Sequence, residues 1–257
     1  MTSTRIPARP PSARDRGYWE IVAQLAAAQK TAARSAPAYS LFINRKLGRL
    51  LAAWAYRAGL TPNAVTGLSA AFTFSGIALL MVFPPSAWLG IAVALLLVTG
   101  YAFDSADGQV ARLRGGGSPA GEWLDHVVDA TKVSMLPLAL AVGLYRSGAV
   151  DTAWLLVPLA SAVVSAVLFF GMILTEQLRR QHGVTASKAV QGRGSWLRPL
   201  LVLPMDYGVL CLSFLLLGWP AVFATAYTLI FAGTTAFLLA ALPKWYRDLA
   251  YVGKQER

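Results

Sequence analysis

Four aspartates in one short stretch of the chain have the spacing of a site that binds metal ions. Asp104 and Asp107 are three residues apart, and Asp125 and Asp129 are four residues apart. These spacings place each pair on one face of a helix. Residues 104–129 hold five of the twelve acidic residues of a chain whose net charge is +11. Such a concentration of acid in a basic protein points to a specific chemical task.

The residues between the two pairs predict a tight helical hairpin. Residues 115–117 are all glycine, which permits a sharp turn, and Ser118 followed by Pro119 is typical of a helix start. Counted along the two helices, Asp104 and Asp125 both lie about 10–12 Å from this turn. Antiparallel helices would therefore bring all four carboxylates to one depth.

Four ionised carboxylates at one place repel one another, so cations must compensate their charge. Ligands that are all oxygen favour hard ions, and two divalent ions neutralise four carboxylates. We therefore predict that Asp104, Asp107, Asp125 and Asp129 bind two ions of Mg²⁺ or Mn²⁺. A site with two such ions is suited to holding a diphosphate and to stabilising the attacking and leaving oxygens of an in-line displacement.

Small residues lie beside the carboxylates. Gly108 and Ala111 follow the first pair, and Gly121 precedes Asp125 by four residues. They leave bare backbone that a planar base or a phosphate can approach closely. The alternative is ordinary close packing between membrane helices.

The surrounding chain predicts an all-α polytopic membrane protein. Hydrophobic residues make up 56% of the chain, and six apolar runs approach the roughly 20 residues that cross a bilayer. The runs span residues 63–83, 88–103, 133–145, 153–174, 197–217 and 221–242. The second and third are short because each helix continues into the acidic stretch. We predict six transmembrane helices joined by short outer loops.

An amphipathic helix is predicted just before the first run. Leu47, Leu50, Leu51 and Trp54 recur at helical spacing, which suits a helix lying in the headgroup plane. The alternative is a soluble helix packed on the cytoplasmic loops. The predicted segments are a cytoplasmic tail with a possible helix (1–38), the interfacial helix (39–59), the six-helix domain (60–243) and a second cytoplasmic tail (244–257).

The distribution of charge predicts the orientation. Among the segments that flank the six runs, the side that holds both termini carries 21 of the 23 Lys and Arg residues, and the opposite side has only Arg146. By the positive-inside rule, both termini and the carboxylates face the cytoplasm of a cell whose plasma membrane holds the protein. This placement makes nucleic acid an unlikely partner and the lipid bilayer the expected one.

The acidic stretch resembles the signature of the CDP-alcohol phosphotransferase family at every defined position. Those positions correspond to Asp104, Asp107, Gly108, Ala111, Arg112, Gly121, Asp125 and Asp129. The gap of eight residues after Arg112 also agrees with the family. Thr61, Pro62, Asn63 and Thr66 resemble the start of the first span in many members.

The resemblance implies transfer of a substituted phosphate from a CDP-linked donor to an alcohol, with release of CMP, usually by a homodimer. It implies that Asp104, Asp107, Asp125 and Asp129 bind metal and that Asp129 is also the catalytic base. It implies CDP contacts from Asn63, Thr66, Asp107, Gly108, Ala111, Arg112 and Gly121. The leading hypothesis is a phosphatidyl transfer from CDP-diacylglycerol to a polar alcohol in phospholipid biosynthesis. The alternative within the family is a soluble donor such as CDP-inositol with a polyol phosphate as acceptor.

Basic residues that face the same compartment predict an acceptor that carries its own phosphate, such as inositol phosphate or glycerol phosphate. These residues are Lys132, Arg179, Arg180, Lys188 and Arg193. Lys132 has the alternative of pairing with the acidic cluster, and the others have that of a solvated, lipid-facing surface.

Three further expectations remain. His126 is expected to stay outside the metal site, because neighbours on a helix point about 100° apart. Asp206, toward the start of the fifth run, is an intramembrane charge with no assigned role. From other functional classes, intramembrane carboxylates also fit a cation transporter, and a catalytically silent scaffold is a further alternative.

Overall fold

The computed structural model describes residues 17–29, 37–183 and 205–255, and in these ranges the chain is helical without strands. The prediction of an all-α fold is confirmed. Five helical stretches are long and apolar enough to cross a membrane: α3 (Pro62–Val82), α4 (Ala87–Leu113), α5 (Pro119–Ser147), η2 with α6 (Thr152–Gln181) and α9 (Pro220–Gln255, of which Pro220–Tyr251 is the candidate span).

The count of six spans is not confirmed. The predicted fifth run is represented in the described residues by α8 (Tyr207–Ser213) and η5 (Phe214–Leu216), a short apolar stretch, and residues 197–204 lie outside the description. The long helix α9 continues to Gln255, so it includes most of the segment predicted as a tail.

Local sequence signals set the helix boundaries around the acidic stretch. Thr61 accepts a hydrogen bond from Ala64 N at the start of α3, and Ser118 accepts one from Gly121 N at the start of α5. Gly115 and Gly116 adopt φ values of +95° and +132°, which glycine tolerates without strain. The predicted hairpin of α4 and α5 is therefore present, with polar helix continuing through both aspartate pairs.

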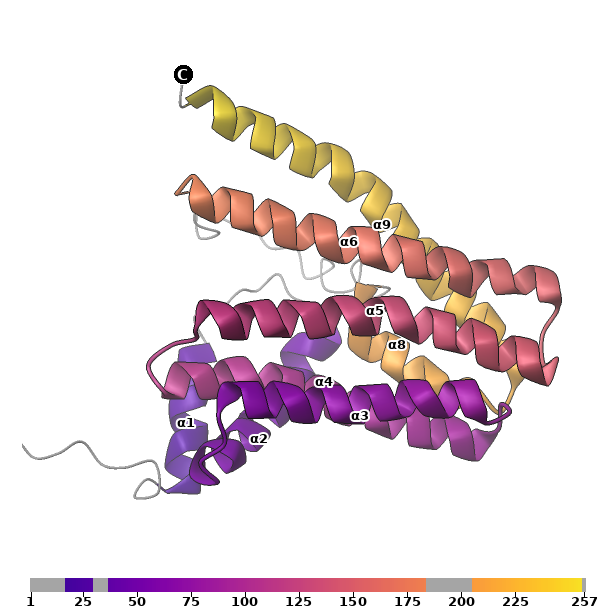
Figure 1. Ribbon diagram of the computed structural model, residues 1–257, viewed down its shortest axis with the longest axis horizontal. Helices are drawn as coiled ribbons and strands as arrows, with labels where there is room; N and C mark the ends of the chain where they lie inside the picture. The colour runs from indigo at the N-terminus through magenta and orange to yellow at the C-terminus, as the bar shows by residue number, and fades with distance from the viewer. Residues whose placement is uncertain (1–16, 30–36, 184–204, 256–257) are drawn as a thin grey trace, which may run out of the picture.

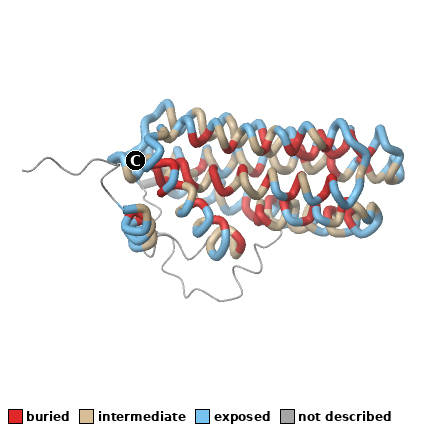
Figure 2. The backbone as a smooth tube through the Cα atoms, turned by 90° about the horizontal axis from the view of Figure 1, so that it is seen from below, coloured by how far each residue is buried: buried red, intermediate tan, exposed pale blue. Residues whose placement is uncertain are grey.

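The long helices run side by side, with α3, α4 and α5 packed together and α6 and α9 beyond α5 (Figure 1). The turn between α4 and α5 lies at the same end as α1 (Tyr18–Gln29), α2 (Arg45–Arg57) and the C-terminus (Figure 1). Figure 2 shows buried residues along the inward faces of the helices. The larger apolar core joins Ile77, Leu97, Leu136, Phe214 and Phe223.

Close backbone contact between α3 and α4 fixes the helix that carries the first aspartate pair. Ser69 Oγ donates a hydrogen bond to Gly100 O at 2.9 Å, one turn before Asp104. A Cβ atom at Gly100 would overlap Thr73 Oγ1 and lie 3.0 Å from Ser69 O, so this close approach requires glycine. The contact thereby holds α4 at a set distance from α3.

A helix occupies the place predicted for the interfacial segment. A short π-helical turn, η1 (Ser40–Asn44), leads into α2, whose small residues Gly48, Ala52 and Ala55 are buried. Leu47, Leu50 and Trp54 are partly exposed on its other side. The location of this helix in the headgroup plane remains a prediction.

Candidate active site

The four aspartates lie between two cavities. Asp107 and Asp125 line the first cavity, which has a volume of about 710 Å³. Asp104 and Asp129 line the second, of about 280 Å³. Each helix of the α4–α5 hairpin therefore contributes one aspartate to each cavity, as its i,i+3 or i,i+4 spacing allows.

Two hydrogen bonds hold the carboxylate of Asp107. Its Oδ2 accepts a hydrogen bond from Thr66 Oγ1 of α3 at 2.7 Å, and its Oδ1 accepts one from Gly108 N at 2.5 Å. Both Asp107 and Thr66 are buried. Hydrogen bonds of this kind orient a carboxylate that binds a metal.

Lys132 joins the other two aspartates. Its Nζ lies 2.5 Å from Asp104 Oδ1 and also forms an ion pair with Asp129. The lysine side chain is only 6% exposed. The predicted alternative that Lys132 pairs with the acidic cluster is therefore what the structure shows, and contact with an acceptor stays a prediction.

His126 lies closer to the aspartates than expected. Ligand atoms of Asp125, His126 and Asp129 lie within 4.8 Å of one another, and His126 Nδ1 is buried without a hydrogen-bond partner among the described residues. The three ligand atoms are therefore closer than the 100° between neighbouring Cβ bonds indicated, because that angle does not limit where a longer side chain ends. The expectation that His126 is not itself a metal ligand stays a prediction.

The donor set fits a hard divalent cation. Asp125 and Asp129 offer carboxylate oxygens close to the His126 imidazole, whose Nδ1 has no hydrogen-bond partner among the described residues, and Mn²⁺ accepts oxygen and imidazole ligands together. Metal binding by all four aspartates stays a prediction. In the described residues Lys132 supplies the compensating positive charge at Asp104 and Asp129.

The first cavity brings together every residue that the sequence predicted to contact CDP: Asn63, Thr66, Asp107, Gly108, Ala111, Arg112 and Gly121. Gly108 faces open space, since a Cβ atom there would meet only Arg112 Nη1 at 3.8 Å. A Cβ at Gly121 would lie 3.1 Å from Asn63 Oδ1. The structure thus places these residues together, while their binding roles remain predictions.

Arg114 also lines the first cavity, and sequence reasoning did not assign it a role. Its Nη2 donates to Leu60 O at 2.8 Å, and its guanidinium lies over the Tyr56 ring at 5.8 Å. Its position two residues after Arg112, beside the glycine turn, was the available signal.

The predicted acceptor cations do not converge. Arg179 pairs with Asp248 at 2.5 Å, and Arg180 pairs with Glu122 at 2.9 Å and with Glu176 at 3.0 Å. Lys188 and Arg193 lie outside the described residues. Of the three described members of the set, only Lys132 lines a cavity with an aspartate.

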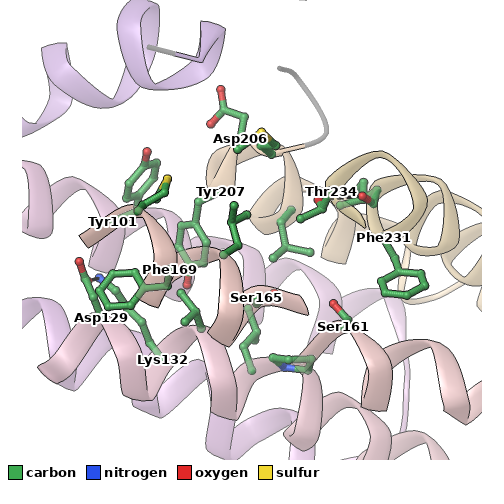
Figure 3. A pocket seen from close by; sticks show the side chains of 18 of the residues that line it. Tyr101, Asp129, Lys132, Ser161, Ser165, Phe169, Asp206, Tyr207, Phe231 and Thr234 are labelled. Carbon is green, nitrogen blue, oxygen red and sulfur yellow. Dashed lines mark hydrogen bonds and ion pairs between the residues drawn. The ribbon is translucent and has the colours of Figure 1, made fainter. Parts of the chain in front are cut away.

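The second cavity was not foreseen from the sequence. Figure 3 shows it enclosed by side chains from separate helices, among them Tyr101, Phe169, Tyr207 and Phe231. These residues follow no common spacing, so no pattern in the sequence predicts that they line one cavity.

The hydrogen bonds of Asp206 explain why a carboxylate is buried at this position. This carboxylate is 1% exposed, caps α8 by accepting from Gly208 N at 3.1 Å, and accepts from Tyr39 N at 2.7 Å and Ser40 N at 3.4 Å. Asp206 therefore ties the segment before α2 to the wall of the second cavity.

Known proteins share this sequence pattern and fold. The family model described as CDP-alcohol phosphatidyltransferase matches residues 59–242. Choline/ethanolaminephosphotransferases 2 and 1 of Arabidopsis thaliana are 35% identical over 121 residues and 36% identical over 88 residues. These matches cover 44% and 34% of this chain, but only 28% and 21% of the two relatives.

Solved structures with a similar fold include a bacterial enzyme. It is the phosphatidylinositol phosphate synthase of Mycobacterium tuberculosis with CDP-DAG bound, and it aligns with a TM-score of 0.50. The alignment covers 79% of this chain and 94% of that chain, at 22% sequence identity.

Proposed function

Because the chain belongs to the CDP-alcohol phosphatidyltransferase family, we propose that it transfers a substituted phosphate from a CDP-linked donor to the hydroxyl of an alcohol and releases CMP. The observation that carries this proposal is the position of the four aspartates between two cavities, one of them lined by all seven residues expected to contact CDP. This arrangement gives donor and acceptor separate approaches to one acidic centre.

The first cavity binds the CDP part of the donor. Arg112 and Arg114 provide positive charge for the diphosphate, and Gly108 leaves room for the donor next to Asp107. Asn63 and Thr66 approach from α3, so three helices surround the nucleotide.

Asp104, Asp107, Asp125 and Asp129 would hold two divalent ions, Mg²⁺ or Mn²⁺, with His126 adjoining. When bound, such ions offset the charge of the diphosphate and favour the departure of CMP. Lys132 keeps Asp104 and Asp129 at a common position between α4 and α5.

Asp129 takes the proton of the acceptor. It lines the second cavity, so a hydroxyl that enters there can reach its carboxylate. The acceptor oxygen forms a bond to phosphorus as the bond from phosphorus to the CMP oxygen breaks, and CMP leaves with that electron pair. The acceptor proton ends on Asp129.

Two substrate pairings satisfy this reaction. In one, CDP-diacylglycerol gives its phosphatidyl group to a polar alcohol; in the other, a water-soluble CDP-alcohol gives its phosphoryl group to a lipid alcohol. The structural relative contains CDP-DAG, but at 22% identity it supports the fold alone. The names of the Arabidopsis relatives support the second pairing for this chain.

The reaction is tested by measuring CMP release from purified protein in lipid nanodiscs. With Mn²⁺ or Mg²⁺ and a matching donor and acceptor, CMP should accumulate, and EDTA should reduce its formation to background until metal is restored. Ion flux without CMP formation would instead identify a transporter.

A substitution at Gly108 tests the nucleotide site. Gly108→Leu should raise the Kd of CDP by roughly tenfold or more, because the new side chain occupies cavity space without displacing packed neighbours. The matched control is Gly67→Leu, on exposed α3 surface where a Cβ atom also meets no neighbour. Equal CDP affinity in the two variants, measured by equilibrium dialysis, would place the nucleotide elsewhere.

We also propose six spans, a plasma-membrane homodimer, and cytoplasmic termini and carboxylates, on the support of the charge distribution and the family resemblance. In whole cells, Ser147→Cys at the end of α5 should react with an impermeant maleimide. Gly117→Cys in the α4–α5 turn should react only after lysis. The reverse pattern would invert the topology.

A further inference from the structure

The second cavity has the character of a lipid site. Its walls include Leu136, Leu168, Phe169, Ile230 and Phe231, contributed by α5, α6 and α9. Figure 3 shows Ser161, Ser165 and Phe169 on the same side of the cavity as Asp129 and Lys132. Three carboxylates also line it: Asp104 and Asp129 of the acidic centre, and Asp206, which accepts hydrogen bonds from backbone N–H groups. Mostly apolar walls with reactive carboxylates at Asp104 and Asp129 suit a ligand that is apolar except for one reactive group.

The cavity lies on the acceptor side of the reaction. Asp107 and Asp125 line the cavity that holds the residues expected to contact CDP, whereas Asp104 and Asp129 line this one. In an in-line displacement the attacking oxygen approaches phosphorus opposite the leaving oxygen. If CMP departs into the first cavity, the attacking alcohol comes from the second.

The charges around the second cavity do not favour an acceptor that carries phosphate. Among the described residues that line it, Lys132 is the one basic side chain, and it already pairs with Asp104 and Asp129. Arg179 and Arg180 pair with other carboxylates and do not line the cavity. A phosphate there would meet three aspartates, Asp104, Asp129 and Asp206, and no uncommitted cation among the described residues that line the cavity.

The helices beside this cavity present apolar surface to the membrane. Only 17% of the most apolar window of α6, and the same share for α9, is buried within the protein. Val163, Phe170, Leu229 and Leu239 are more than 60% exposed on these two helices. A ligand dissolved in the bilayer therefore meets the two helices that form one side of the cavity.

We infer that the second cavity binds the apolar part of a lipid alcohol and presents its hydroxyl to Asp129, so that the lipid is the acceptor. This inference rests on the proposed function and names its acceptor class. The lipid oxygen bonds to phosphorus, its proton passes to Asp129, and CMP leaves with the electron pair of the broken phosphorus–oxygen bond. The donor is then a water-soluble CDP-alcohol, and the product is a phospholipid.

The test compares two substrate pairings in nanodiscs supplied with Mn²⁺. One pairing is dioleoylglycerol with CDP-choline, CDP-ethanolamine or CDP-inositol; the other is CDP-diacylglycerol with serine, glycerol phosphate, inositol or inositol phosphate. The wild-type protein should release CMP with dioleoylglycerol and at least one soluble donor. This comparison requires no variant.

A cavity-filling variant locates the lipid. Ser165→Phe should raise the KM for dioleoylglycerol roughly tenfold or more while the Kd of CDP is unchanged, because Ser165 lines the second cavity and not the first. The matched control, Val163→Phe, places the same ring on the exposed side of α6, where Val163 is 64% exposed, and should behave as wild type.

The outcomes separate this inference from the proposed function. CMP release only from CDP-diacylglycerol with a water-soluble alcohol would overturn the lipid-acceptor assignment and leave the proposed function intact. An unchanged KM for dioleoylglycerol in a folded Ser165→Phe protein would also overturn it. Absence of CMP from every metal-loaded mixture would instead contradict the proposed function.

Discussion

Asp129→Asn is expected to reduce the rate of CMP release by about 10³-fold, the range seen when a general base is lost. An amide cannot take the proton of the acceptor, although its carbonyl oxygen can still face the site. Asp129 lines the second cavity and not the first, so much of the CDP affinity should remain, with a Kd within about tenfold of wild type, although the variant also alters one expected metal ligand. Stopped turnover with retained nucleotide binding is the signature of a lost base.

The control for this variant makes the same chemical change elsewhere. Asp151 caps η2 by accepting from Ala153 N at 2.7 Å, in the connection that follows α5. Asn is an equally good helix cap, so Asp151→Asn should fold and turn over normally. Near-normal turnover in Asp129→Asn would show that another group takes the proton.

Asp107→Asn is expected to abolish both the metal-dependent binding of CDP and the release of CMP. It removes a charge from the first cavity and from the expected metal ligands, and the amide cannot preserve both hydrogen bonds that Asp107 accepts from Thr66 and Gly108. We expect at least roughly a 100-fold loss of metal-dependent CDP affinity together with loss of CMP release, since even groups that only orient a ligand cost 10–100-fold. Isothermal titration of CDP with and without Mn²⁺ measures this loss.

Thr66→Val provides a graded comparison for Asp107. It removes the 2.7 Å hydrogen bond but leaves the carboxylate in place, so its loss of affinity should be smaller, roughly 10-fold. Undiminished, metal-dependent CDP binding by Asp107→Asn would contradict the assignment of this aspartate. Asp129→Asn and Asp107→Asn are thus both expected to lose turnover, but only Asp107→Asn is expected to lose most of its CDP affinity.

The helices that carry the aspartates were predictable because their signals are local. Helix caps at Thr61 and Ser118 and the glycines at 115–117 each depend on residues a few positions apart, and the structure contains each feature. The spacing of Asp104, Asp107, Asp125 and Asp129 also sufficed to place them on one hairpin. Short-range spacing on two antiparallel helices leaves little freedom in where the side chains meet.

The second cavity could not be predicted, because its walls come from helices far apart in the chain. Tyr101, Phe169, Tyr207 and Phe231 are ordinary apolar-helix residues until packing brings them together. The hydrogen bonds of Asp206 could not be predicted for the same reason, since its partners Tyr39 and Ser40 lie more than 160 positions earlier. The closeness of the His126 imidazole to Asp125 and Asp129 was not predicted, because the backbone angle alone does not determine how far an imidazole reaches.

The arginines predicted to bind the acceptor show that the position of a basic residue in the sequence does not reveal what it contacts. Arg179 and Arg180 lie near the end of α6, beside the predicted basic loop. Arg179 pairs with Asp248 of α9, and Arg180 pairs with Glu122 of α5 and Glu176 of α6. Local sequence gives the sign of a charge and not its partner.

The most direct measurement of the central claim is the mass balance of one turnover reaction. Purified protein with Mn²⁺, a CDP-linked donor and its alcohol should form CMP and a new phosphodiester in equal amounts, and EDTA should stop both together. CMP without the phosphodiester would show hydrolysis, and equal formation of both products in EDTA would contradict the metal-assisted transfer that the four aspartates are proposed to perform.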